Sequence, residues 1–501
     1  MDIFDGLMLG LSTATAFSNF VYCFLGVLLG TAVGVLPGLG PVATISMLLP
    51  FTFGLPVDTA LIMLAGIFYG TQYGGSTTAI LMNLPGEASS VVTTLDGHEM
   101  AKQGKAGRAL AAAAIGSFFA GTVGTLFIAV AAPLLAGLAL TFGPAEYFSL
   151  IVLGLVTSMV LTSGSLLTAF GMALLGVLLG MVGTDINSGA ARYTFGTPNL
   201  LDGLNFVVVA TGVFGLGDVL VNLENERSRM ASIAPVSSLF PTREDWRRMV
   251  GPILRGTGIG VVLGVLPGAG VLLASFSAYA MEKKVSRHPE EFGKGAIEGV
   301  AAPESANNAA AQTCFIPMLT LGLPGTATMA LMIGALVVQG VQPGPEILSQ
   351  QPALFWGLVV SMWIGNVMLL FLNLPLVGMW AKLISVPYHF LFPMICVFMA
   401  IGVYSINNSV FDVELMVLFG LLGYFFRKVG AEPAPLILAL ILGPMAEEYL
   451  RRTLLLSHGD ATVFFTSPVS LGTLIVAALL LLSIVSPAFR RVREEGLQEA
   501  E

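Results

Sequence analysis

Two polar clusters interrupt long apolar stretches of the sequence, and their residue types suit the binding of a small anion. Both clusters are followed by a Leu-Pro-Gly turn. The candidate residues of the first are Tyr73, Gly74, Gly75, Ser76, Thr77, Thr78, Asn83, Pro85 and Gly86, and those of the second are Ser305, Asn307, Asn308, Pro324, Gly325 and Thr326. Hydroxyls, amides and helix N-termini donate hydrogen bonds to a carboxylate and supply partial positive charge. Neither cluster contains Lys or Arg, so an anion there would be held by neutral donors.

The second cluster also offers oxygen ligands for a coupling ion. Glu304, Asn307 and Asn308 suit Na⁺, a hard cation, and Glu304 alone could instead carry a proton. The structural alternative is that these polar side chains only hold helices together through interhelical hydrogen bonds. For a single Ser or Thr we favour that alternative, whereas the two clusters taken together favour a functional site.

The elements that position these clusters are predicted to be membrane helices. Of the 501 residues, 55% are hydrophobic and only 10% are charged, against about 25% in soluble domains. This composition predicts an all-α polytopic membrane protein, and at roughly 20 residues a span we expect about 12 to 14 membrane segments in a lipid bilayer. There is no basic stripe that would bind nucleic acid. The three cysteines and four histidines lack ligand spacing, so no metal site is predicted.

An internal repeat relates the two halves of the chain. The pattern GxxxGVLPGxG spans residues 30–40 and recurs at 260–270, 230 residues later, and Asn-Leu-Pro-Gly at 83–86 is echoed by Gly-Leu-Pro-Gly at 322–325. The motifs add the candidate residues Pro37, Gly38, Gly40, Pro267, Gly268 and Gly270. Pro removes a backbone donor and Gly permits positive φ, so each motif should break a helix. Paired breaks at corresponding places point to a transporter binding site. We therefore expect two pseudo-symmetric, inverted repeats with broken or re-entrant helical hairpins.

The charge distribution divides the chain and orients it. We expect a first membrane repeat at 1–222, a polar linker at 223–249, a second repeat with additional C-terminal spans at 250–489, and a tail at 490–501. Positive charge marks the cytoplasmic side. The linker, the tail and the loop at 102–108 should therefore be cytoplasmic, whereas the N-terminus, without Lys or Arg in its first 20 residues, should be periplasmic.

These motifs resemble those of the large membrane subunit of the tripartite tricarboxylate transporters, the TctA family. The resemblance rests on the segments 34–41, 69–78, 83–86 and 299–308 and extends over about residues 15–450. It implies a bacterial inner-membrane permease, not an enzyme, that works with a small four-helix membrane subunit (TctB-like) and a periplasmic solute-binding protein (TctC-like). It also implies transport driven by a Na⁺ or H⁺ gradient, with citrate, other di- and tricarboxylates, and some aromatic acids and amino acids as family substrates. Alternating access is the mechanism we expect.

Rival functions rest on shorter motifs. Residues 215–218 match the GxGD pattern of intramembrane aspartyl proteases, and Pro352-Ala-Leu matches their PAL motif. That chemistry needs two aspartates sharing one site, and the partner Tyr-Asp motif is absent from the sequence. Asp218 is expected near the end of its helix. A passive anion channel is a further alternative, whereas the missing GxxxxGK[ST] loop argues against a nucleotide-driven pump.

Overall fold

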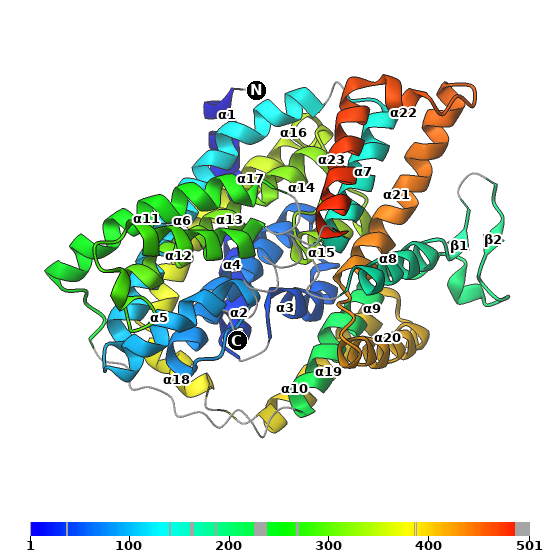
Figure 1. The fold of residues 1–501 in the computed structure, drawn as a ribbon. Helices are drawn as coiled ribbons and strands as arrows, with labels where there is room; N and C mark the ends of the chain where they lie inside the picture. The colour runs from blue at the N-terminus through cyan, green and yellow to red at the C-terminus, as the bar shows by residue number, and fades with distance from the viewer. Residues whose placement is uncertain are drawn as a thin grey trace.

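The chain is almost wholly helical, as the sequence predicts (Figure 1). The computed structural model describes residues 2–36, 39–139, 142–160, 165–185, 188–224, 238–266, 270–384, 386 and 388–485. The candidates Pro37, Gly38, Pro267 and Gly268 lie outside the described residues, as do most of the linker, at 225–237, and the tail, at 486–501.

The two halves of the chain contribute similar numbers of helices. The first half forms α1 (Ile3–Ala14), α2 (Phe17–Gly34), α3 (Pro41–Leu48), α4 (Val57–Met82), α5 (Val91–Lys102), α6 (Ala106–Ala139), α7 (Pro144–Val160), α8 (Leu166–Gly180), α9 (Phe206–Ala210) and α10 (Gly217–Glu224). The second half forms α11 (Arg243–Gly264), α12 (Gly270–Val285), α13 (Glu298–Thr313), α14 (Phe315–Leu321), α15 (Ala327–Val338), α16 (Glu346–Gln350), α17 (Pro352–Asn373), α18 (Val377–Ile384), α19 (Tyr388–Asn407), α20 (Val410–Lys428), α21 (Ala434–Leu456), α22 (Val463–Thr466) and α23 (Pro468–Val485).

Shorter elements connect these helices. The 3₁₀ helices are η1 (Leu49–Thr52), η2 (Ala88–Ser90), η3 (Pro198–Leu200) and η6 (Pro289–Glu291), and a π-helix, η4 (Thr211–Leu216), joins α9 to α10. A small hairpin that the sequence analysis did not foresee pairs β1 (Gly183–Thr184) with β2 (Ala191–Arg192) antiparallel, with Gly183 opposite Arg192. Ion pairs from Arg192 to Asp185 and to Glu447 hold this hairpin against α21.

Five helices among the described residues are long and apolar enough to cross a membrane. They cover Phe17–Gly34, Ala106–Gly137, Phe206–Glu224, Pro352–Asn373 and Phe390–Asn407. Other apolar helices are shorter, at 10–17 residues, among them Ile3–Ala14, Leu166–Gly180 and Ala327–Val338, and the apolar stretch at 250–275 is broken between α11 and α12. The chain is therefore a polytopic helical membrane protein whose apolar segments are repeatedly interrupted.

Glycines at every fourth position bring two helix pairs into close contact, one pair in each half. A Cβ built on Gly30 of α2 would lie 2.4 Å from the carbonyl oxygen of Ile67 in α4. A Cβ on Gly260 of α11 would lie 2.3 Å from the carbonyl oxygen of Ala306 in α13. Only glycine permits backbones to approach this closely, which is the usual role of such stripes in lipid. The glycine patterns in the two halves therefore make the same kind of contact, α2 with α4 and α11 with α13.

The two Leu-Pro-Gly turns share a backbone geometry at positions 239 residues apart. Asn83 ends α4 with a φ of 58°, and Gly322 ends α14 with a φ of 69°, both in the left-handed region. Four residues later, Glu87 and Thr326 both adopt a φ of -149° and a ψ of 165° and cap the next helical turn. We call residues 83–87 the first tip and residues 322–326 the second tip. Each joins two helical segments.

The two tips differ in their surroundings. In the first, Asn83 is exposed and Glu87 is partly exposed, whereas Gly322 to Gly325 of the second are buried. A Cβ on Gly322 would lie 2.6 Å from the carbonyl oxygen of Pro343, so the loop before α16 covers the second tip. The two tips therefore share a backbone geometry, but the first is open to solvent and the second is covered by protein.

Charged residues gather where α5, α6, α11 and the loop before α13 meet, a region we call the charged face. Arg108 at the start of α6 donates to Asp245 at the start of α11, with Nε 2.6 Å from Oδ2, and Gln103 donates to the Lys294 carbonyl over 2.7 Å. Burial alone would raise the pKa of Asp245, but hydrogen bonds from Arg108 and Thr242 hold it below its usual value. Three polar segments that are far apart in the sequence therefore lie together.

Candidate functional site

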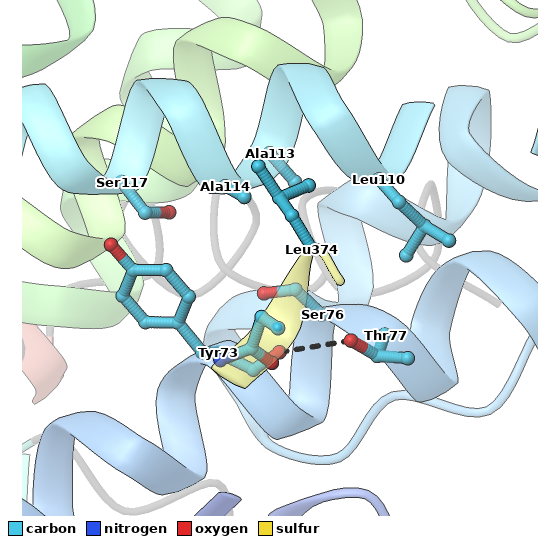
Figure 2. A pocket seen from close by; sticks show the side chains of 9 residues that line it. Tyr73, Ser76, Thr77, Leu110, Ala113, Ala114, Ser117 and Leu374 are labelled. Atoms are coloured by element: carbon cyan, nitrogen blue, oxygen red, sulfur yellow. Dashed lines mark hydrogen bonds between the residues drawn. The ribbon is translucent and has the colours of Figure 1, made fainter. Parts of the chain in front are cut away.

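A pocket of about 300 Å³, part of it open to solvent, lies between α4, α6 and the end of α17. Its lining residues are Tyr73, Ser76, Thr77, Leu110, Ala113, Ala114, Ser117, Asn373 and Leu374. Figure 2 shows the α4 side chains approaching from one side and the α6 side chains from the other. None of the lining side chains is charged. The pocket therefore suits a small molecule held by neutral hydrogen-bonding groups.

The polar groups of the pocket are held in place by partners from three helices. The Tyr73 hydroxyl donates to Asn366 Oδ1 of α17 over 3.0 Å. The Ser117 hydroxyl accepts a hydrogen bond from Asn308 Nδ2 over 2.6 Å, which leaves its own proton for a ligand. Asn373 Oδ1 is buried and has no hydrogen-bond partner among the described residues. A ligand can therefore receive a hydrogen bond from Ser117 and donate one to Asn373.

Glu304 lies directly beside this pocket. Its carboxylate accepts hydrogen bonds from Ser76 over 2.6 Å and from Thr93 of α5 over 2.5 Å, and its side chain is almost fully buried. Ser76 therefore belongs both to the pocket lining and to the surroundings of this carboxylate. The hydrogen bond joins α4 to α13, so it also connects the two halves of the chain.

A second carboxylate, that of Glu87 at the first tip, is joined to α13 as well. Asn307 Nδ2 donates to Glu87 Oε1 over 2.9 Å. Ser89 and Gln72 also lie within hydrogen-bonding reach of this carboxylate, and the charge of Glu304 acts on it. No Lys or Arg among the described residues pairs with either glutamate. We call Glu87, Glu304, Gln72 and Asn307 the acidic centre.

The remaining predicted residues of the first cluster make packing contacts or hydrogen bonds with the backbone of neighbouring segments. Gly74 lies against α2, Gly75 packs on Gly86 of the first tip, and the Thr78 hydroxyl donates to the Val35 carbonyl over 2.8 Å. Gly40 lies near the Gly86 carbonyl. Asn83 and Pro85 complete the first tip and do not line the pocket.

The predicted residues of the second half are similarly divided. Ser305 turns back onto the Ala301 carbonyl of its own helix, and Gly270 packs on the end of α11. Pro324, Gly325 and Thr326 form the second tip, where the Thr326 hydroxyl accepts from the Met329 amide over 3.1 Å. None of these residues lines the pocket. The structure therefore brings together Tyr73, Ser76 and Thr77 at the pocket, and Glu304 and Asn307 beside it, with Asn308 supporting Ser117.

Sequence reasoning missed several members of this polar region. They are Gln72, Glu87, Thr93, Ser117, Asn366 and Asn373. Gln72 and Glu87 belong to the first polar segment, at 69–87, although neither was chosen as a site residue. One further signal stands in α17. Asn366 and Asn373 lie seven residues apart in an otherwise apolar helix, so both fall on one face of α17.

Asp96 of α5 fixes the start of α13. Its Oδ1 accepts hydrogen bonds from the backbone amides of Gly293, Gly295 and Ala296 over 2.8 to 2.9 Å, and its Oδ2 accepts from the Tyr279 hydroxyl over 2.9 Å. The carboxylate is fully buried. This contact sets the position of the helix that carries Glu304 and Asn307.

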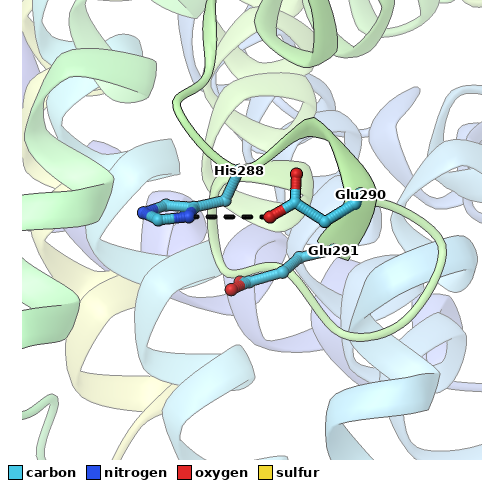
Figure 3. A group of neighbouring side chains, drawn as sticks. All are labelled: His288, Glu290 and Glu291. Carbon is cyan, nitrogen blue, oxygen red and sulfur yellow. Dashed lines mark ion pairs between the residues drawn. The ribbon is translucent and has the colours of Figure 1, made fainter.

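Two other groups of ionisable residues have structural partners. His288, Glu290 and Glu291 point toward one another on the surface (Figure 3), but Glu291 is occupied by an ion pair with Arg248. Asp218 of the GxGD segment forms an ion pair with Arg427 of α20. It lies at the start of α10, six residues before the end of a continuous helical element and so near that end, as expected. A partner arginine in place of a second aspartate does not suit aspartyl-protease chemistry.

Comparisons with known proteins agree with this architecture. A model of the tripartite tricarboxylate transporter TctA family matches residues 20–438. An Agrobacterium vitis protein, described as an uncharacterized 52.8 kDa protein in the TAR-I ttuC' 3' region, is 56% identical over 501 residues, which cover all of both chains. An uncharacterized protein in the TAR-II ttuC' 3' region of the same organism is 54% identical over 240 residues, 48% of this chain and 99% of that protein. No solved structure matches. The family model covers most of the chain, and the chain therefore belongs to the tripartite tricarboxylate transporter TctA family.

Proposed function

We propose that this chain is the permease subunit of a binding-protein-dependent, ion-gradient-driven importer of small carboxylates. The observation that carries the proposal is the pocket itself, which is lined by hydroxyls and an amide, contains no charged side chain, and contacts the acidic centre through the hydrogen bond from Ser76 to Glu304. Neutral donors can bind a carboxylate without an ion pair too strong to release it. A neighbouring pair of carboxylates can meanwhile bind the ion that drives uptake.

Alternating access is the mechanism we propose for this importer. The 239-residue correspondence of the two tips, and the matched glycine contacts of α2 with α4 and α11 with α13, support inverted repeats that meet at the site. One tip is exposed and the other is covered. If the first tip became covered while the second became exposed, the pocket would open first to one side of the membrane and then to the other.

Membership of the TctA family supports the partners that we assign. We propose a small TctB-like membrane subunit and a TctC-like periplasmic binding protein, with this chain in the bacterial inner membrane. The charged face supports a cytoplasmic location for the loop at 102–108 and the start of α11. The N-terminus would then be periplasmic and the C-terminus cytoplasmic.

Reconstituted transport tests the proposal. The chain and the small subunit are placed in proteoliposomes, and uptake of radiolabelled di- and tricarboxylates is measured with and without binding protein, under an imposed Na⁺ or H⁺ gradient. We expect uptake that needs both the binding protein and one gradient, with no requirement for ATP. Equally fast flux without binding protein and without a gradient would instead identify a passive anion channel.

A further inference from the structure

Two buried carboxamide oxygens in the acidic centre have no hydrogen-bond partner among the described residues. They are Oδ1 of Asn307 and Oε1 of Gln72, and each residue is only 1% exposed. Such an acceptor is costly to leave unpaired in a buried site. The Asn307 amide nitrogen donates to the Glu87 carboxylate, and Gln72 lies within reach of the same carboxylate. Because the oxygen and nitrogen of one carboxamide are roughly 2 Å apart, the unpaired Asn307 oxygen lies close to that carboxylate.

The charge of the acidic centre is not balanced by the protein. Glu304 is satisfied by two hydroxyls and Glu87 by amides, and no Lys or Arg among the described residues bonds to either. Buried carboxylates are normally paired with a cation or coordinated to a metal ion. Glu87 is partly exposed, so an ion can reach it from the first tip.

From these observations we propose that the Glu87 carboxylate and the side-chain oxygens of Gln72 and Asn307 bind a monovalent cation of the size of Na⁺, with Glu304 adding negative charge from behind. One carboxylate and two neutral carbonyl oxygens match a monovalent ion, because Glu304 is already engaged by its two hydroxyls. Rotation of each carboxamide by a half-turn about its terminal bond places the oxygen where the nitrogen was. The same side chains can therefore serve the carboxylate without the cation and the cation when it is bound.

The cation would also control entry of the substrate. This step rests on the proposed function. Ser76 lines the pocket and donates to Glu304, so the two carboxylates stand close to any anion in the pocket. Without a cation they repel it, and with one the repulsion is reduced. Binding of the two ligands must then be reciprocal, so that each raises the affinity for the other.

The test measures Na⁺ binding directly, apart from transport. Binding of ²²Na⁺ to the purified chain is followed by scintillation proximity, with N-methyl-D-glucamine chloride keeping the ionic strength constant. Loss of a ligand to the cation is worth about 1.5–3 kcal/mol, or roughly tenfold or more in affinity. We therefore expect Gln72→Met and Asn307→Leu each to weaken Na⁺ binding about tenfold, and Glu87→Gln to weaken it further.

The chain supplies a matched control in Gln312. It is also buried, at 2% exposure, and its Oε1 has no partner among the described residues, but neither glutamate is among its hydrogen-bond partners. Gln312→Met should leave the Na⁺ affinity within about twofold, whereas Asn307→Asp, which keeps an oxygen ligand and adds a negative charge, should bind Na⁺ at least as tightly as the unchanged chain. Asn307→Asp also covers the case in which Asn307→Leu does not fold, since loss of Na⁺ binding in the folded Asp variant would overturn the site.

Other outcomes separate this inference from the proposed function. Absence of Na⁺ binding, or binding of Ca²⁺ in its place, overturns the site, even if a proton gradient still drives carboxylate uptake. Equal losses in Gln72→Met and Gln312→Met also overturn it. Saturable Na⁺ binding with the expected variant pattern supports the site, even if no carboxylate is transported, a result that would contradict only the proposed function. If a carboxylate does not raise the Na⁺ affinity of a complex that transports it, the proposal that the cation controls substrate entry is wrong.

Discussion

At the scale of single residues, the polar region depends on Asp96, which is predicted to touch neither substrate nor ion. Its carboxylate accepts hydrogen bonds from three backbone amides and one hydroxyl and so fixes the start of α13. Asp96→Ala leaves these donors unsatisfied, and we expect a loss of roughly 3 kcal/mol or more in the free energy of unfolding. The midpoint of thermal unfolding in detergent provides the measurement.

Glu99 on the same helix is the matched control for Asp96. It is partly exposed, and its one ion pair among the described residues is with Lys102 across one helical turn, an interaction worth well under about 1 kcal/mol. Glu99→Gln should therefore leave the unfolding midpoint unchanged. Equal shifts for the two variants would show that Asp96 has no special part in holding α13.

The sequence was informative about which residues are polar at membrane depth, and less so about which of them meet. Ser76, Glu304 and Asn307 were predicted as site residues from their clusters, and the structure brings them together. The Asn307 contact with Glu87 spans 220 residues, and the Glu304 contact with Thr93 spans 211. Such pairs are set by helix packing, which has no local signature, so Glu87 and Thr93 were not foreseen.

At the scale of helices, the glycine stripes make a sharp prediction. A Cβ on Gly260 would meet the Ala306 carbonyl oxygen at 2.3 Å, whereas a Cβ on Gly258 of the same helix has open space around it. Gly260→Ala should push α11 away from α13 and lower the yield of folded protein and its unfolding temperature. Gly258→Ala should be neutral or slightly stabilising, since alanine is favoured over glycine in a helix by about 1 kcal/mol. Size-exclusion profiles and thermal unfolding of both variants compare them directly.

The result that would contradict this account is an equal tolerance of alanine at positions 258 and 260. The same comparison can be repeated in the first half with Gly30, whose contact with the Ile67 carbonyl oxygen is of the same kind. If Gly30→Ala were destabilised and Gly260→Ala were tolerated, the close helix contact would require glycine in the first half but not in the second.

The helix breaks at the Leu-Pro-Gly turns were foreseen, but the conformation of the polar clusters before them was not. In the structure the whole cluster from Tyr69 to Thr78 lies inside the continuous helix α4, which ends at Met82. Gly74 and Gly75 resemble a helix break in the sequence, yet here they allow the helix to approach α2 and the first tip. Glycine serves both purposes, and only the packing distinguishes them.

At the scale of the whole molecule, composition indicated a membrane protein, but the arrangement of its helices could not be predicted. Helices α7 and α8 from the first half pack with α21 and α23 from the second, and these helices stand at one side of Figure 1, away from α5, α11 and α12. Hydropathy identifies the apolar segments without saying which of them are neighbours. The sequence boundary at 223–249 therefore does not separate the helices in space.

The orientation of the molecule in the membrane can be tested through the charged face. Single cysteines replace exposed Lys102, Lys283 and Asp5 in a Cys396→Ser background, because the other two cysteines are buried. A membrane-impermeant maleimide should label Asp5→Cys in intact cells. It should label Lys102→Cys and Lys283→Cys only after the inner membrane is permeabilised, as the positive-inside rule requires. Labelling of the two lysine positions from opposite sides would contradict the charged face as one membrane surface.

The most direct test of the account asks whether a transported carboxylate occupies the pocket between α4, α6 and α17. Ala113 lines that pocket, and Ala113→Cys in the Cys396→Ser background places a reactive thiol there, with exposed Ala461→Cys as the control outside it. The rate of thiol modification is measured in proteoliposomes with binding protein present. We predict that a transported carboxylate slows modification at position 113 and leaves position 461 unchanged. An unchanged rate at position 113, at carboxylate concentrations that saturate uptake, would contradict the central claim.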